Sequence, residues 1–151
     1  MGVRAVVRDD NIAVIYVRDL PKNPDISYKF FSVLINSGAN VDIISATSSS
    51  STGDIMFTTH ETDVPCAADA LERMFPDLRV FFESDVSKIT VFGDEMLGTR
   101  RISSDIVKCL FDNDVFPVSI STSDIMVAVI VKKADVRKGF SSLIKTFELE
   151  L

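Results

Sequence analysis

Two places near the start of the chain carry residue types that bind a small zwitterion. The run Lys22-Asn23-Pro24-Asp25-Ile26 pairs a helix-capping residue with a proline suited to the first helical turn. A helix that begins there offers backbone N–H groups and a positive dipole end, which favour a carboxylate such as that of an amino acid. Asp42, in the strand expected after that helix, can pair with an ammonium group, although an ordinary polar strand residue is the alternative.

Other reactive residue types lack the neighbours that chemistry requires. The single histidine, His60, stands beside Glu61 and Asp63, but a metal site needs more convergent ligands, so a solvated loop is the simpler interpretation. The run Ser48-Ser49-Ser50-Ser51 lacks a nearby base and is read as a loop rather than a nucleophile. The glycines do not form a phosphate-binding loop, since they are isolated at Gly53, Gly93 and Gly98.

Composition sets the class of protein. The 151 residues are 46% hydrophobic, which is enough for a folded core, and the net charge of −6 disfavours nucleic acid as a partner. No apolar run approaches the roughly 20 residues of a membrane span, so we expect no membrane partner and a cytoplasmic location. Cys66 and Cys109 both fall in apolar helical patterns and are expected to be buried free thiols.

The sequence repeats itself at a shift of about 75 positions. Residues 3–7 recur at 78–82, residues 12–15 recur at 89–92, and Asp54-Ile55-Met56 returns as Asp124-Ile125-Met126. Duplicated modules diverge in this way, at their connections rather than within their elements. Val118 occupies the position of Asp42 in the second repeat, so the first repeat is the better candidate for binding.

Each repeat is predicted to run strand, strand, helix, strand, strand, helix. In the first repeat we expect a turn at residues 9–11 between two strands, a helix from Pro24 that is stopped by Gly38, and a second helix that Pro76 ends. The remaining expected strands are 3–7, 12–17, 41–45 and 55–59, then 78–82, 89–92, 118–121 and 125–131; the helices of the second repeat carry residues 102–110 and 136–147.

The pattern predicts an α+β protein made of two ferredoxin-like βαββαβ units, each an antiparallel sheet with helices on one face. The repeat places the units at residues 1–77 and 78–151. Periodicity leaves open whether each opening strand completes its own sheet or that of its neighbour, so the opening strands may be exchanged between units.

These residues resemble the tandem ACT domains of aspartokinases over nearly the whole chain. The first ACT domain is indicated by Asn40-Val41-Asp42-Ile43-Ile44 and Gly53-Asp54-Ile55-Met56-Phe57-Thr58. The second is indicated by Ile89-Thr90-Val91-Phe92-Gly93, Met96, Ile120-Ser121-Thr122-Ser123-Asp124-Ile125 and the ending Phe147-Glu148-Leu149.

The resemblance implies a function. Aspartokinases phosphorylate the side-chain carboxylate of aspartate with ATP, and their ACT pair binds an end-product amino acid, lysine or threonine, which inhibits the kinase. The Lys-Phe-Gly-Gly-type motif of the catalytic domain is absent, so the chain resembles the regulatory part alone: it needs no cofactor, and ATP and Mg²⁺ belong to a kinase domain in cis or on a separate subunit. Effector contacts carry over onto residues 23–26, Asp42, its strand neighbour Ile44, and Met96.

The chain departs from the family pattern at both turns. Asp25 stands where the first ACT turn commonly has glycine, and Thr99-Arg100-Arg101 replaces a His-Pro-Gly-like turn in the second. We therefore keep two alternatives beside the aspartokinase regulatory module: a stand-alone ACT-pair sensor or interaction subunit for another amino-acid enzyme, and a duplicated domain whose ligand site has decayed. The family, and the open edges of small sheets, also predict a homodimer.

Overall fold

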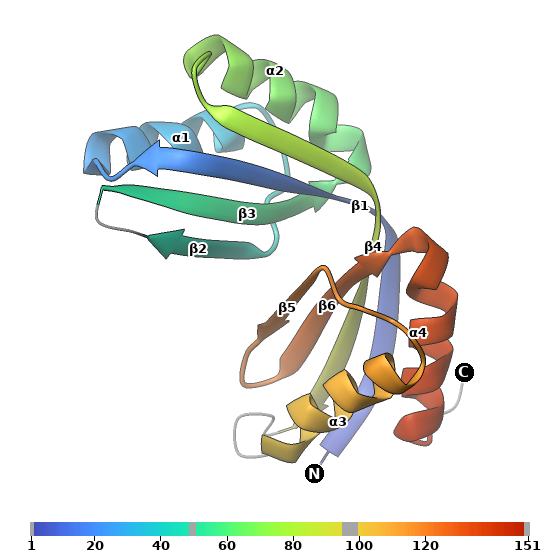
Figure 1. The fold of residues 1–151 in the computed structure, drawn as a ribbon. Coiled ribbons are helices and arrows are strands. Elements are labelled where there is room, and N and C mark those ends of the chain that lie inside the picture. The colour runs from blue at the N-terminus through green and yellow to red at the C-terminus, as the bar shows by residue number, and fades with distance from the viewer. Residues whose placement is uncertain (1, 49–50, 95–99, 150–151) are drawn as a thin grey trace. The chain divides into compact units, whose positions relative to one another are not determined.

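The computed structural model describes residues 2–48, 51–94 and 100–149 (Figure 1). Neighbouring strands are hydrogen-bonded in the order β2-β3-β1-β4-β6-β5. No described helix is long and apolar enough to cross a membrane. The elements in chain order are β1 (Gly2–Pro21), α1 (Pro24–Asn36), β2 (Ile44–Ser48), β3 (Thr52–His60), the 3-10 turn η1 (Glu61–Asp63), α2 (Val64–Met74), β4 (Arg79–Asp94), α3 (Arg100–Asp112), β5 (Ser119–Thr122), β6 (Met126–Lys132) and α4 (Lys133–Thr146).

The chain forms two compact units. The inner unit is Asn11–Ser84, and the outer unit comprises the described residues of Met1–Asp10 and Asp85–Leu151. The inner unit has strand order β2-β3-β1-β4 and the outer unit has β1-β4-β6-β5, because β1 and β4 each contribute one half to either unit. Helices α1 and α2 cover one face of the inner sheet, and α3 and α4 cover one face of the outer sheet (Figure 1). The predicted ferredoxin-like α+β fold is confirmed.

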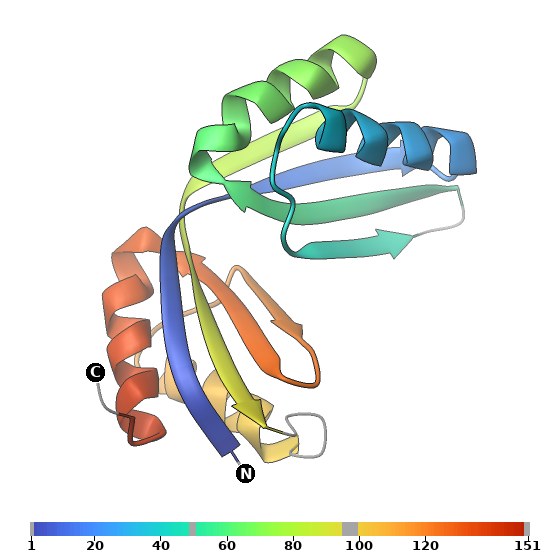
Figure 2. The ribbon, with the colours of Figure 1, turned by 180° about the vertical axis from the view of Figure 1, so that it is seen from behind.

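The units do not coincide with the two sequence repeats. Where the repeat placed the units at 1–77 and 78–151, the structure divides the chain after Asp10 and after Ser84. The first half of β1 therefore lies in the unit built by the second repeat, and residues 79–84 close the sheet of the first. Figure 2 shows this first half of β1 running beside β4.

Each unit has its own apolar core between its sheet and its helices. In the inner unit the ring of Phe30, on α1, meets the ring of Phe57, on β3, edge-on at 6.3 Å between centroids. Such aromatic contacts add to the burial of apolar area, which dominates the stability of small domains. The inner core also contains Ile15, Val17, Leu34 and Leu71, and the outer core contains Val6, Ile89, Val91, Ile106, Leu110, Val129 and Leu143.

The boundaries of α1 confirm the sequence prediction. Asn23 is the N-cap in an extended conformation, and its Oδ1 accepts a hydrogen bond from the N–H of Asp25 at 2.9 Å. Pro24 occupies the first helical position, where its missing N–H has no consequence. Gly38 follows the helix with φ +85°, the left-handed conformation that glycine adopts without strain.

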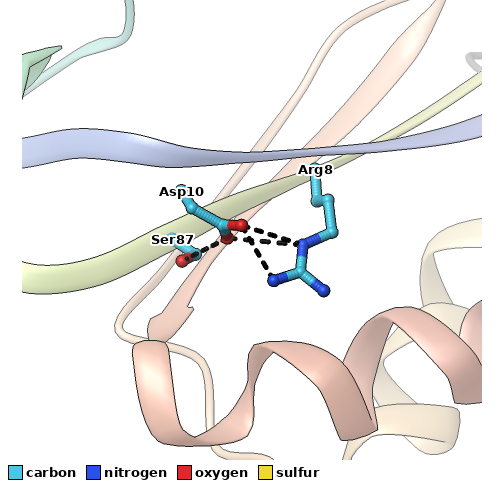
Figure 3. A network of polar contacts seen from close by, with 3 residues as sticks. All are labelled: Arg8, Asp10 and Ser87. Carbon is cyan, nitrogen blue, oxygen red and sulfur yellow. Dashed lines mark hydrogen bonds and ion pairs between the residues drawn. The ribbon is translucent and has the colours of Figure 1, made fainter.

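The predicted turn at residues 9–11 is wrong, because β1 continues through it without a break. The carboxylate of Asp10 finds partners in the extended chain: its Oδ1 accepts from the Ser87 hydroxyl at 2.8 Å and its Oδ2 from Nη2 of Arg8 at 2.8 Å (Figure 3). The guanidinium of Arg8 also lies 5.8 Å from the ring centroid of Phe140 on α4. Likewise, β4 replaces the two separate strands expected at 78–82 and 89–92.

The contacts of Asp10 with Arg8 and Ser87 change the pKa of its carboxyl group. The hydrogen bond from Arg8 lowers the pKa of Asp10 below its ordinary value, partial burial opposes the shift, and the bond from Ser87 adds to the lowering. Ser87 itself is fully buried, so its hydroxyl needs the partner that Asp10 provides.

Two smaller expectations also need correction. Cys66 is exposed rather than buried, because it lies in the first turn of α2, where its Sγ–H points to the carbonyl of Asp63 at 3.1 Å, while Ala67 and Leu71 face the core. Cys109 is buried as expected. The strand expected at 41–45 begins later, at Ile44.

Candidate functional site

The turn before α1 is held in place by backbone hydrogen bonds. The N–H of Lys22 donates to the carbonyl of Ser51 at 3.0 Å, which ties the turn to the connection between β2 and β3. The N–H of Asn23 donates to the carbonyl of Pro21 at 2.8 Å, and the N–H of Ser27 donates back to the carbonyl of Asn23 at 3.0 Å. These hydrogen bonds hold the N-terminus of α1 next to the connection between β2 and β3.

A hollow of about 200 Å³ opens between this turn and the hairpin. Lys22 and Ser27 line it from the turn and α1, whereas Thr47 and Ser48 line it from β2. A second hollow of about 220 Å³ adjoins it and shares Thr47, Ser48 and Gly53. Its remaining lining residues are Asp19, Thr52 and Asp54. The polar groups here suit a small hydrophilic ligand.

Gly53 lets the two strands of the hairpin approach closely. A Cβ atom at this position would lie 2.9 Å from the carbonyl oxygen of Thr47, closer than carbon and oxygen atoms pack. Sequence reasoning read Ser48 and the following serines as an uninvolved loop and passed over Thr47. The signal that would have found them is their place at the end of the strand that neighbours the α1 turn.

Asp42 does not join the α1 turn within the chain. Its N–H donates to the carbonyl of Thr58 at 2.9 Å, whereas Ser48, at the far end of β2, pairs with Gly53. Asp42 lies two residues before β2, and at about 3.3 Å per residue of extended chain it is roughly 20 Å from Ser48. Of the two candidate groups, the turn therefore stands at one end of β2 and the aspartate at the other.

The remaining carried-over contacts fall in different places. Ile44 opens β2, pairs with Phe57, and is 50% exposed. Met96 lies outside the described residues. In the second repeat, Arg101 lies in the first turn of α3, with its Nε 3.9 Å from a carboxylate oxygen of Asp105, and Thr99 also lies outside the described residues.

His60 belongs to a local hydrogen-bonded cluster. Its Nε2 lies 2.8 Å from the side-chain nitrogen of Asn40, and the backbone N–H of Asn40 donates to a carboxylate oxygen of Asp63 at 3.1 Å. These bonds join the segment after α1 to the start of α2. Within the described ranges, no group of three or more His, Cys, Asp or Glu residues is placed to hold a metal ion.

Comparison with known proteins shows what the chain resembles. Residues 15–75, which cover most of the inner unit, match the model of the ACT domain. This segment therefore resembles an ACT domain. Over 95% of its length the chain is 28% identical to the aspartokinase of Corynebacterium efficiens, and over 97% it is 25% identical to aspartokinase 2 of Bacillus subtilis. The resemblance of the chain to aspartokinases is thereby confirmed.

Solved structures show the same fold. The ligand-free regulatory subunit of aspartate kinase from Thermus thermophilus superposes with a TM-score of 0.89 at 21% identity, and the match covers 97% of this chain and 99% of that protein. A putative C-terminal regulatory domain of aspartate kinase from Porphyromonas gingivalis gives 0.69 at 24% identity, covering 95% and 96%. The chain spans about a third of the length of the curated relatives, namely 36% of the Corynebacterium efficiens protein.

Proposed function

We propose that the chain is the amino-acid-sensing regulatory region of an aspartate kinase. A free amino acid, lysine or threonine, binds the inner unit and inhibits the phosphorylation of aspartate. Similarity to aspartokinases over nearly the whole chain supports a role in an aspartate kinase. The observation that carries the binding role is the polar hollow between the N-terminus of α1 and the β2–β3 hairpin.

The ligand carboxylate lies at the start of α1. The helix dipole favours an anion there, and Lys22, which lines the hollow, adds a positive charge. Asp25 stands in the same first turn and opposes an anion, but its side chain is exposed, so solvent screens its charge. The hydroxyls of Ser27, Thr47 and Ser48 complete the polar surface.

The ammonium group is bound by Asp42 of a second copy of the chain. Strand β2 is at the edge of the strand order, and all five of its residues are exposed. If two copies pair antiparallel along this edge, Asp42 of one copy lies opposite residues near Ser48 of the other, beside the hollow. The homodimer and the effector site are therefore one proposal: each site needs both copies, and a bound ligand stabilises one packing of the pair.

Coupling to the kinase requires little free energy. A difference of about 1–3 kcal/mol between two packings gives several-fold to hundred-fold inhibition. The chain needs no cofactor for this role, since ATP and Mg²⁺ act in the kinase domain, and the role belongs in the cytoplasm with the kinase substrates.

A second candidate is a separate regulatory subunit that binds a kinase in trans. It is favoured by the likeness in fold to the regulatory subunit of aspartate kinase from Thermus thermophilus. Reading the coding sequence upstream of this chain separates the two: a kinase domain in frame supports the first, and a stop codon before the chain supports the second.

Isothermal titration calorimetry of the chain with the twenty amino acids tests the site. We expect lysine or threonine to bind, and Asp42→Ala to weaken that binding by roughly ten- to hundred-fold, because a charge-assisted hydrogen bond contributes about 1.5–3 kcal/mol. Arg100→Ala, in the corresponding turn of the second repeat, is the control and should change little. Unchanged affinity in Asp42→Ala with lost binding in Arg100→Ala would place the effector in the other repeat.

A further inference from the structure

The inner sheet has an open face, opposite its helices, that carries a set of polar side chains. Side chains alternate between the two faces of a sheet along each strand. Because Ile15, Val17 and Phe57 point into the core, the residues next to them in sequence point to the open face. Cross-strand pairing then aligns these neighbours in rows: Tyr16 and Ser45 both pair with Met56, and Thr47 pairs with Asp54. Strands β1, β2 and β3 therefore present one continuous surface.

A hollow of about 240 Å³ lies on this open face. It is lined by Tyr16, Arg18, Asp54 and Met56, with Ser45 and Thr47. Tyr16, Arg18 and Ser45 distinguish it from the two hollows beside the α1 turn, although Thr47 and Asp54 are shared with one or both of them. The volume fits one free amino acid with a few water molecules.

The two charged groups are held by partners in the fold. The guanidinium of Arg18 lies 5.9 Å from the ring centroid of Phe81, so the side chain leans from β1 toward β4. Asp54 stands on β3, on the other side of β1, and its Oδ1 accepts a hydrogen bond from the N–H of Asp19 at 3.0 Å. A cation on β1 and an anion on the neighbouring strand β3 thus both line the hollow, and each contacts another residue of the inner unit.

We propose that this open-face hollow is a second binding site for a free amino acid, with the ligand carboxylate on Arg18 and an ammonium group on Asp54. A guanidinium binds a carboxylate through two parallel hydrogen bonds, and a carboxylate accepts from an ammonium; both bonds are strengthened by charge. The hydroxyls of Tyr16, Ser45 and Thr47 supply further partners. This site lies across the sheet from the α1 turn and does not depend on a second copy of the chain.

Calorimetry with L-lysine, L-threonine and glycine, each titrated into the chain, tests the open-face site. At least one of the three should show a class of binding that Arg18→Gln and Asp54→Asn each weaken tenfold or more. Asp54→Asn keeps the oxygen that accepts from Asp19 and removes only the charge. Arg79→Gln is the matched control, because it removes another exposed arginine of the inner unit, which pairs with Asp19 at 3.4 Å and does not line the hollow.

The outcomes separate this proposal from the effector site. Binding that survives Asp42→Ala and falls in Arg18→Gln supports the open-face site even if the proposed effector site fails. Wild-type affinity for all three ligands in both Arg18→Gln and Asp54→Asn overturns the open-face site, and so does an equal loss in Arg79→Gln. If Asp42→Ala abolishes all binding while Arg18→Gln changes nothing, the effector site alone stands.

Discussion

At the scale of single residues, Asp10 shows how one carboxylate changes the conformation of a segment. An acidic pair followed by asparagine is typical of a turn, because these side chains bond to nearby backbone in non-helical, non-extended conformations. Here the Asp10 carboxylate instead accepts hydrogen bonds from Arg8, two residues earlier on the same strand, and from Ser87, on the neighbouring strand (Figure 3). The strand remains extended, and it passes from the outer unit into the inner unit directly after Asp10.

The Asp10 network makes stability depend on pH in a defined direction. In the folded chain the pKa of Asp10 is lowered from its ordinary value of 3.8. The ionised carboxylate therefore stabilises the fold fully above pH 3.8, and this stabilisation is lost as pH falls through the folded pKa. We expect Asp10→Asn to lower the free energy of unfolding at pH 7 by about 1 kcal/mol, with half-exposed charges discounted for solvent. Urea unfolding of both proteins from pH 7 to pH 3 measures this, and their difference should shrink at the acid end.

Asp69→Asn provides the control for that experiment. Asp69 forms an exposed pair with Arg73 one helical turn away, at 3.1 Å, and such pairs contribute little. If Asp69→Asn lowers the free energy of unfolding as much as Asp10→Asn, any exposed carboxylate has the same effect and the Asp10 network is not special. If the stability difference between Asp10→Asn and the unaltered chain grows toward low pH, the expected direction of the pH dependence is wrong.

At the scale of elements, local signals predicted helices better than strand connections. Asn23, Pro24 and Gly38 define α1 because capping and left-handed conformations depend on neighbouring residues only. The breaks expected in β1 and β4 failed because the polar residues there are satisfied by residues distant in sequence, such as Ser87 for Asp10. Exposure of Cys66 was missed for a related reason, since helical spacing alone did not show which side of α2 faces the core.

The N-cap residue of α1, Asn23, is expected to stabilise the folded chain. Asn23→Ala removes the acceptor for the N–H of Asp25 and should destabilise the chain by about 1 kcal/mol. Asn23→Asp keeps a capping oxygen and should lie close to wild type. Thermal unfolding followed by circular dichroism compares the three proteins, and equal melting temperatures for Asn23→Ala and wild type would mean that the cap does not stabilise the folded chain.

At the scale of the whole molecule, the internal repeat predicted two similar sheets but could not assign their shared strands. Partner choice depends on contacts between residues far apart in the sequence, such as Arg4 with Asp94, 90 positions away, which leave no periodic signal. The candidate site shows the same limit. The sequence placed the α1 turn and Asp42 together, whereas the strand register sets them at opposite ends of β2.

The proposed dimer follows from what the inner unit leaves exposed at its β2 edge. Ser27 lines the hollow beside β2, and Ile35 follows two helical turns later on the same side of α1, where it is 70% exposed, beside a strand whose Ile44 is 50% exposed. Burying apolar side chains of this size favours association.

We therefore expect light scattering at tens of micromolar to give twice the chain mass of 16.7 kDa. Ile35→Asp should shift that mass toward the monomer, because pairing along β2 would bury the new charge against its own copy. Met74→Asp, which changes an exposed residue on α2 that is 57% accessible and lies away from the β2 edge, is the matched control and should stay dimeric. A monomeric mass for the unaltered chain, with and without lysine or threonine, would rule out both the dimer and an effector site completed by Asp42 of a second copy.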